Sequence, residues 1–262
     1  MIEYGLFNYQ SGMKIGFCFL VRNNISWENI WSKFFTLADT AEYSIYIHAK
    51  SNVVHTSLEN VFVDPNPVET EWASVSLVKA TKQLLTTAFK DECDSVIFLS
   101  GDSLPLWNFQ TIQSLCCETL FSLQPNLGLS TKQSNQVKRE FDRIRSFYKV
   151  KSTLQLVKQN MFFCIKKDDF QLIKDVEIDT FPSKEVPDEY FWANQLIIKA
   201  GKFFENLNFM FANDDPTKTQ ALSWIVDKNL LHHARSKGYI FIRKVTDFSD
   251  KQSKEYYQRL IC

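Results

Sequence analysis

The stretch "DSVIFLSGDSLPL" (94–106) joins an uninterrupted apolar run to an abrupt polar ending. Val96 to Leu99 are all apolar, which is typical of a strand in the core of a sheet. The turn "SGDS" (100–103) follows directly. Because α/β sheets bind ligands beyond the carboxyl ends of their strands, this turn is a candidate ligand-binding segment.

The chain before this stretch alternates between strand and helix patterns. Apolar runs predict strands, and apolar side chains at helical spacing predict helices. The strands are expected at 14–22, 43–49 and 60–64, and the helices at 23–35 and 72–91. The resulting order β-α-β-β-α-β predicts an α/β layered sheet with parallel strands. "HAKS" (48–51) then lies at the same edge as "SGDS".

The second half of the chain is less regular. The polar segment 124–150, in which basic residues outnumber acidic ones, is predicted to be a loop that passes into a helix. Further patterns predict a strand and short helix over 161–179, a helix over 187–200, strands at 203–212, 221–227 and 238–245, and an amphipathic helix over 248–261. The simplest interpretation is a polar tail at 1–12 and a single domain at 13–262.

Composition narrows the class of protein. The 262 residues carry 30 basic and 30 acidic side chains, so the balance gives no support to a nucleic-acid binder. No apolar run approaches the length of a membrane span. The seven-residue run "IGFCFLV" (15–21) follows just one nearby lysine and lacks a cleavage-site pattern, so we expect no signal peptide and a soluble cytoplasmic protein. The six cysteines form no CxxC pair and are expected to be free thiols, mostly buried.

A second candidate site lies in "FPSKEVPDEYFWANQL" (181–196). Pro187 suits the first position of a helix, which places Asp188 and Glu189 in the first turn. Acids there can simply offset the helix dipole. The dipole and the free N–H groups would also lower the pKa of such an acid, and an ionised carboxylate can act as a general base.

These segments resemble, in order, a known family. "VPDEYFWANQL" is similar to the "SPDEYLWAT" motif of the core-2/I-branching glycosyltransferases. The same family is resembled by "KIGFCFLVRNNISWENIWSKFF", "YSIYIHAKS", "VETEWASVSLVKATKQLL", "VIFLSGDSLPLWNFQTIQSL" and "IFIRKVTDF". The resemblance covers about residues 13–245 and rests on the collinear order of these segments.

The resemblance implies an inverting glycosyltransferase with a GT-A type fold, whose mixed, mostly parallel sheet is flanked by helices. It implies transfer of a sugar, such as xylose or N-acetylglucosamine, from a UDP-sugar to a hydroxyl of a glycan acceptor. No metal or other cofactor is expected. Glu189 is the implied general base. The family's diphosphate-binding lysine maps to Lys244, with Arg243 beside it, and Lys218 is the candidate for its arginine.

The resemblance also points to the donor and acceptor sites. An aspartate that contacts the donor nucleoside in the family is absent here, where the chain reads His48, Ala49 and Lys50. The candidates for donor contacts are Arg22, His48, Glu71, Ser100, Gly101 and Asp102. Gly101 would allow a close backbone approach, and Asp102 could accept hydrogen bonds from sugar hydroxyls. The acceptor candidates are Arg139, Arg143, Trp192 and Asp188, and Trp72 could stack on a sugar.

Two other functions stay open on the sequence. The missing carboxylate at Ala49 favours a glycan- or nucleotide-binding module without catalysis. A metal-dependent GT-A transferase or a nucleotidyltransferase would instead need Asp102 or Asp214 on a metal.

Overall fold

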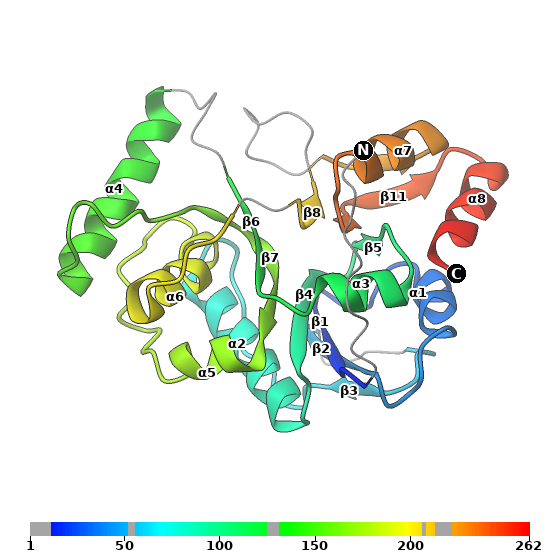
Figure 1. Cartoon of the computed structure of the whole chain (residues 1–262), viewed down its shortest axis with the longest axis horizontal. Helices are drawn as coiled ribbons and strands as arrows, with labels where there is room; N and C mark the ends of the chain where they lie inside the picture. Colours follow the sequence, from blue (N-terminus) through cyan, green and yellow to red (C-terminus); the bar gives the residue numbers. More distant parts are fainter. Residues whose placement is uncertain (1–11, 52–55, 125–130, 206–207, 213–221) are drawn as a thin grey trace.

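The computed structural model describes residues 12–51, 56–124, 131–205, 208–212 and 222–262 (Figure 1). Its central sheet has, within these residues, the strand order β3-β2-β1-β4-β7-β6. These strands are β1 (Ile15–Val21), β2 (Tyr43–Ala49), β3 (Val61–Val63), β4 (Ser95–Ser100), β6 (Leu120–Leu123) and β7 (Gln159–Lys166). Neighbouring strands from β3 to β4 are parallel, whereas β7 runs antiparallel to both β4 and β6. The expected mixed, mostly parallel sheet is therefore confirmed.

Helices cover both faces of this sheet. Alternate residues of β1 point to opposite faces, and Phe17 and Phe19 meet Trp31 of α1 (Glu28–Phe35) at ring-centroid distances of 6.1 and 5.1 Å. On the other face, Tyr46 of β2 donates a 2.6 Å hydrogen bond to Asp91, the residue that ends α2 (Val75–Lys90). The predicted α/β layering is thus confirmed at the strands with the strongest apolar patterns.

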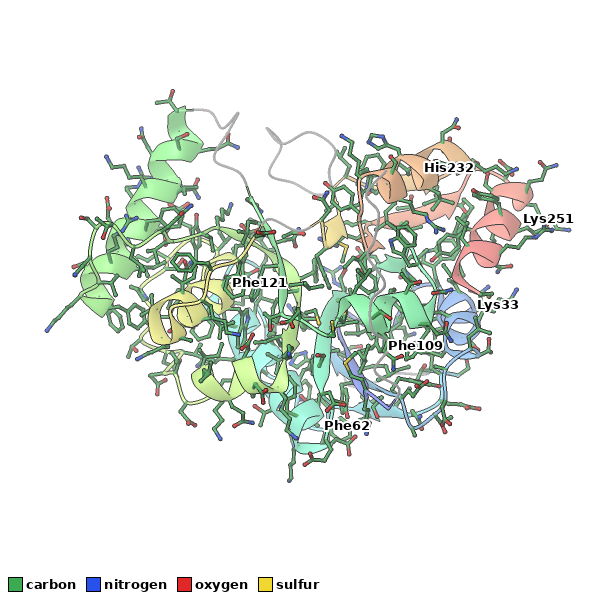
Figure 2. The ribbon with its side chains drawn as sticks, in the orientation of Figure 1. Lys33, Phe62, Phe109, Phe121, His232 and Lys251 are labelled. Carbon is green, nitrogen blue, oxygen red and sulfur yellow. The ribbon has the colours of Figure 1, made fainter. Side chains whose placement is uncertain are left out.

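The remaining helices are distributed around the sheet (Figure 1). They are α3 (Phe109–Leu115), α4 (Thr131–Tyr148), α5 (Lys167–Ile173), α6 (Trp192–Ala200), α7 (Lys228–Ser236) and α8 (Lys251–Ile261). In Figure 1, α4 lies at one end of the molecule and α7 and α8 at the other. Phe109 and Phe121 lie in the interior, whereas Lys251 projects from the surface of α8 with 88% of its side chain exposed (Figure 2).

Besides the central sheet, the described residues form two small sheets. One has the order β5-β10-β8, formed by Leu104–Pro105, Phe241–Ile242 and Met210–Phe211, and the other pairs β11 (Val245–Phe248) with β9 (Trp224–Val226). The predicted strand at 238–245 is therefore wrong as a single element. It is divided because Ile242 pairs with β5 and β8, whereas Val245 pairs with β9. Within the described part of the predicted strand at 203–212, the strand is β8. The sequence did not predict α3 or β6, and of α7 it indicated only that His232 and His233 lie on a helix surface.

The predicted helix over 187–200 is also divided. Pro187–Glu189 form a 3-10 turn, η1, and the α-helix α6 begins only at Trp192. Asp188 and Glu189 consequently precede α6 instead of occupying its first turn.

Two further sequence expectations can be compared with the structure. All six cysteines are free, and Cys18, Cys93, Cys116 and Cys164 are buried, as expected for most of them. Within the described ranges, none of the helices combines the length and the apolar character that crossing a membrane requires.

Candidate functional site

The polar turn after β4 contacts a segment from the far end of the chain. Arg243 Nε lies 3.1 Å from Ser100 Oγ and 3.4 Å from Asp102 Oδ1. Ser100 Oγ in turn donates to Asp102 Oδ1. The guanidinium of Arg243 also stacks on Phe162 of β7, 4.6 Å from the ring centroid. Ser100 and Asp102, which were predicted to contact the donor, thus form one cluster with Arg243, which was predicted to bind the diphosphate.

Strand pairing places Arg243 there. β5 follows the "SGDS" turn directly, and β10 pairs antiparallel with it through Ile242 and Leu104. Arg243, the residue after β10, is therefore brought back beside the turn. The Val245 N–H donates to the Asp102 carbonyl at 3.1 Å and holds the next residues in the same position.

Gly101 is required by packing within the chain. A Cβ atom at this position would lie 2.8 Å from Val21 Cγ1 and 3.0 Å from the Asn24 carbonyl oxygen. The Gly101 carbonyl accepts a 2.7 Å hydrogen bond from the Ser26 N–H. The close approach expected of Gly101 is therefore made to the turn after β1, whose residue Arg22 is exposed and was predicted to contact the donor.

Glu189 forms an ion pair that the sequence analysis missed. Lys158 Nζ lies 2.8 Å from Glu189 Oε2, and the two side chains are 13% and 22% exposed. Lys158 precedes β7, which runs antiparallel to β4. The start of β7 consequently lies at the same edge of the sheet as the end of β4, which brings Lys158 and Glu189 to the edge that carries Ser100, Asp102 and Arg243.

The turn that carries Glu189 is held on both sides. The Lys184 N–H donates a 3.0 Å hydrogen bond to Glu140, a fully buried acid on α4 that also pairs with Arg143. On the other side, the Ala193 N–H donates to Gln159 Oε1 of β7 at 2.6 Å. The loop 183–193 is thus attached to α4 and to the central sheet.

Burial is the largest influence on the pKa values of the two acids. Desolvation raises the pKa of Glu189, and the Lys158 ammonium opposes this rise. Desolvation, followed by the charge of Glu189, raises the pKa of Asp188 to about 7. The sequence predicted a lowered pKa from a helix dipole, and this was wrong because both acids lie in an enclosed turn before α6.

Three predicted contact residues have buried side chains, so each of them is enclosed by other parts of the chain. His48 on β2 is 0% exposed, and desolvation lowers its pKa. Asp188 is 7% exposed, and its Oδ1 has no hydrogen-bond partner among the described residues. Trp192 is 2% exposed and packs at 5.7 Å from the ring of Phe163. The Trp192 ring is therefore part of the hydrophobic core.

Other predicted residues do lie at the surface. Glu71 is exposed beside Trp72, whose exposed fraction is 89%. Arg139 on α4 has 58% of its side chain exposed and lies 3.9 Å from Glu185, whereas Arg143 is engaged by the buried Glu140. The side chain of Arg139 is therefore more exposed than that of Arg143, which is 37% exposed.

The structure describes one of the two other predicted phosphate-binding residues. Lys244 is hydrogen-bonded through its backbone to Leu222 and Trp224, and its side chain has no ion pair with a described residue. Lys218 and Asp214 lie outside the described residues. Among the residues that the structure does describe, no three His, Cys, Asp or Glu side chains are grouped as metal ligands.

The chain matches the sequence model of a known protein family. The model described as "Core-2/I-Branching enzyme" matches residues 15–174, which is more than half of the chain. The chain belongs to the core-2/I-branching enzyme family. The match includes the Ser100–Asp102 turn and Lys158 but ends before Glu189 and Arg243.

Relatives of this core-2/I-branching enzyme are distant. The rice (Oryza sativa subsp. japonica) protein "Glycosyltransferase BC10" is 28% identical over 103 residues, which are 37% of this chain and 26% of that protein. The match thus spans about a quarter of the rice protein's length. Two solved structures are similar at 11% identity: the bifunctional glycosyltransferase WbbM in its apo form and the galactosyltransferase LgtC with donor and acceptor sugar analogues. Their TM-scores are 0.44 and 0.42, over 92% and 94% of this chain and 47% and 94% of theirs.

Proposed function

We propose that this chain is an inverting, metal-independent glycosyltransferase that moves a sugar, xylose or N-acetylglucosamine, from a UDP-sugar to a hydroxyl of a glycan acceptor. Family membership supports the reaction class. The observation that carries the proposal further is the position of Glu189, whose carboxylate lies at the carboxyl edge of the sheet together with Arg243.

In this proposal Glu189 is the general base. The acceptor O–H transfers its proton to the free oxygen of the Glu189 carboxylate, because Oε2 is taken by Lys158. The acceptor oxygen then forms a bond to the anomeric carbon, and the bond from that carbon to the diphosphate breaks on the opposite face. UDP leaves with the electron pair of the broken bond, so negative charge grows on its phosphates.

Arg243 is the residue proposed to stabilise this charge. Its Nε is occupied by Ser100 and Asp102, which fixes the plane of the guanidinium and leaves its terminal N–H groups for phosphate oxygens. A fixed cation at the leaving group lowers the barrier because it needs no reorganisation during the reaction. Lys244, the next residue, is a second candidate for the same phosphates.

The test is UDP release from a panel of UDP-sugars, measured with and without EDTA. Wild type, Glu189→Gln and the control Glu185→Gln, an acid in the loop that leads to η1, are compared. The proposal expects release from one donor that survives EDTA, is lost in Glu189→Gln and persists in Glu185→Gln. Release that persists in Glu189→Gln contradicts the base assignment, and release that EDTA abolishes favours a metal-dependent transferase.

One observation favours a second candidate, a binding module without turnover. Ala49 stands where the family has a carboxylate for the donor nucleoside, and it is buried at the end of β2. UDP binding that is measurable by calorimetry, with no release from any donor in the presence of a broad acceptor panel, would favour this alternative.

A further inference from the structure

Lys158 is held in position beside the carboxylate of Glu189. Its carbonyl accepts a 2.7 Å hydrogen bond from the Gln124 N–H, which anchors its backbone beside the end of β6. Its ammonium lies 6.0 Å from the centroid of the Tyr190 ring and 2.8 Å from Glu189 Oε2. The lysine is therefore restrained by a backbone contact, an aromatic ring and an ion pair.

Two carboxyl groups and one ammonium are enclosed at this turn. Asp188 and Glu189 are adjacent in η1, and among the described residues Lys158 is the cation that pairs with Glu189. An ionised carboxylate that loses its partner in such a position is strongly destabilised and takes up a proton instead. The charge of Glu189 therefore depends on Lys158.

Several other charged groups of the elements around η1 have partners elsewhere. On α4, Glu140 pairs with Arg143, and in the preceding loop Glu185 faces Arg139. On α2, which also packs against η1, Lys79 pairs with Asp179 and Lys82 donates to the Val176 carbonyl. The Tyr190 hydroxyl stays neutral, because burial and the nearby acids raise its pKa.

We infer that Lys158 is a positioning residue that keeps Glu189 ionised and turned so that one carboxylate oxygen is left for the acceptor hydroxyl. This inference rests on the proposed function of Glu189 as general base. It assigns to Lys158 no contact with the donor or the acceptor.

Removal of the ammonium has a defined consequence. Without Lys158, desolvation of Glu189 is unopposed and the pKa of its carboxyl rises further. Each unit of increase lowers the ionised fraction about tenfold at a pH below the pKa. Turnover should fall on the acid side and recover as the pH increases, which a purely structural loss would not produce.

The experiment titrates Glu189 directly and does not depend on turnover. Protein labelled with ¹³C at the glutamate side-chain carboxyl is titrated by NMR, and the Glu189 resonance is assigned by its absence in Glu189→Gln. The variants are Lys158→Gln, the uncharged and apolar Lys158→Met and the charge-preserving Lys158→Arg. The control is Lys167→Gln, because Lys167 follows the other end of β7 and pairs with Glu92 at 2.5 Å.

The expected result is an upward shift of the Glu189 midpoint by about one pH unit or more in the uncharged variants, which is a tenfold loss of ionised carboxylate. Lys158→Arg should stay near wild type, and Lys167→Gln should leave the midpoint unchanged. An unchanged midpoint in whichever uncharged variant folds would overturn the inference.

The pH profile of UDP release separates this inference from the proposed function. If the acid limb of turnover moves with the NMR midpoint, both are supported. If the midpoint moves and the limb does not, Lys158 still controls the charge of Glu189, but Glu189 is not the base and the catalytic part of the inference fails.

Discussion

Arg243 Nε lies 3.4 Å from Asp102 Oδ1, so a residue near the end of the chain meets the turn that ends β4. The pairing of β10 with β5 creates this contact. It gives the Asp102 carboxylate, for which the sequence predicts a contact with sugar hydroxyls, a partner within the chain. At the donor end of the proposed site, Ser100, Asp102 and Arg243 therefore hold one another in position through hydrogen bonds.

Arg243→Ala should weaken UDP binding by roughly tenfold to a hundredfold, since a hydrogen bond to a charged group contributes about 1.5–3 kcal/mol. Arg243→Lys should restore part of the affinity, because an ammonium supplies the charge without the planar fork. Calorimetric titration with UDP measures both. Arg235→Ala is the control, since that guanidinium stacks on Trp107 at 4.0 Å outside the cluster. Equal UDP affinity in Arg243→Ala and Arg235→Ala would refute the role.

Gly101→Ala should both destabilise the protein and weaken UDP binding. The added Cβ would approach Val21 and the Asn24 carbonyl, and such overpacking costs about 1–3 kcal/mol. Relief of this contact must displace the turn after β1 that carries Arg22. Urea denaturation and UDP titration are the measurements.

Gly201→Ala provides the comparison for this prediction. Gly201 ends α6 with a φ of 62° and has open space around it, so alanine there is strained by its backbone conformation, at a cost of roughly 1–2 kcal/mol. UDP binding should stay unchanged in this variant. A loss of UDP affinity that is the same in both variants would mean that general destabilisation, and not the turn after β1, is responsible.

The parallel core of the sheet could be predicted because β1, β2 and β4 are apolar runs whose pattern is local. The contact between Arg243 and Asp102 could not, because it depends on which short strand pairs with β10. The ion pair of Lys158 could not be predicted either, because a single lysine before an apolar run is also typical of a solvated strand end.

The raised pKa values of the two acids in η1 could likewise not be predicted from the sequence. Whether an acid after a proline faces solvent or is enclosed depends on α4, α2 and β7, which are distant in the chain. The helix-dipole argument assumed exposure, and desolvation reversed its sign for both Asp188 and Glu189.

Asp188→Asn should change the stability of the protein in a pH-dependent way. The folded pKa of Asp188, about 7, lies above the unfolded value of about 3.9, so folding takes up a proton between these values. The stability associated with the protonated carboxyl is present below about pH 4 and is lost as the pH rises through about 7. Asparagine cannot ionise, so the variant should gain stability relative to wild type over this window.

The gain should reach a few kcal/mol, at about 1.4 kcal/mol for each pKa unit, and then level off. Urea denaturation at several pH values gives the difference between the two proteins. Asp250→Asn should show the opposite trend, because hydrogen bonds from Ser253 and Ser249 lower the pKa of Asp250 at the start of α8. A difference between Asp188→Asn and wild type that is constant with pH would refute the buried, neutral state of Asp188.

Trp192 and Trp72 should respond in opposite ways to replacement by alanine. Trp192 is enclosed by Phe163, Phe170 and Phe191, so its loss leaves a cavity that costs about 3–5 kcal/mol. Trp72 is 89% exposed just before α2, which packs against η1, and its loss should change stability by no more than about 0.5 kcal/mol. If the exposed ring stacks on a sugar, Trp72→Ala should instead raise the KM for the acceptor. Denaturation curves together with acceptor kinetics make the comparison. A Trp192→Ala protein of normal stability with a raised acceptor KM would restore the acceptor role that the sequence indicated for Trp192.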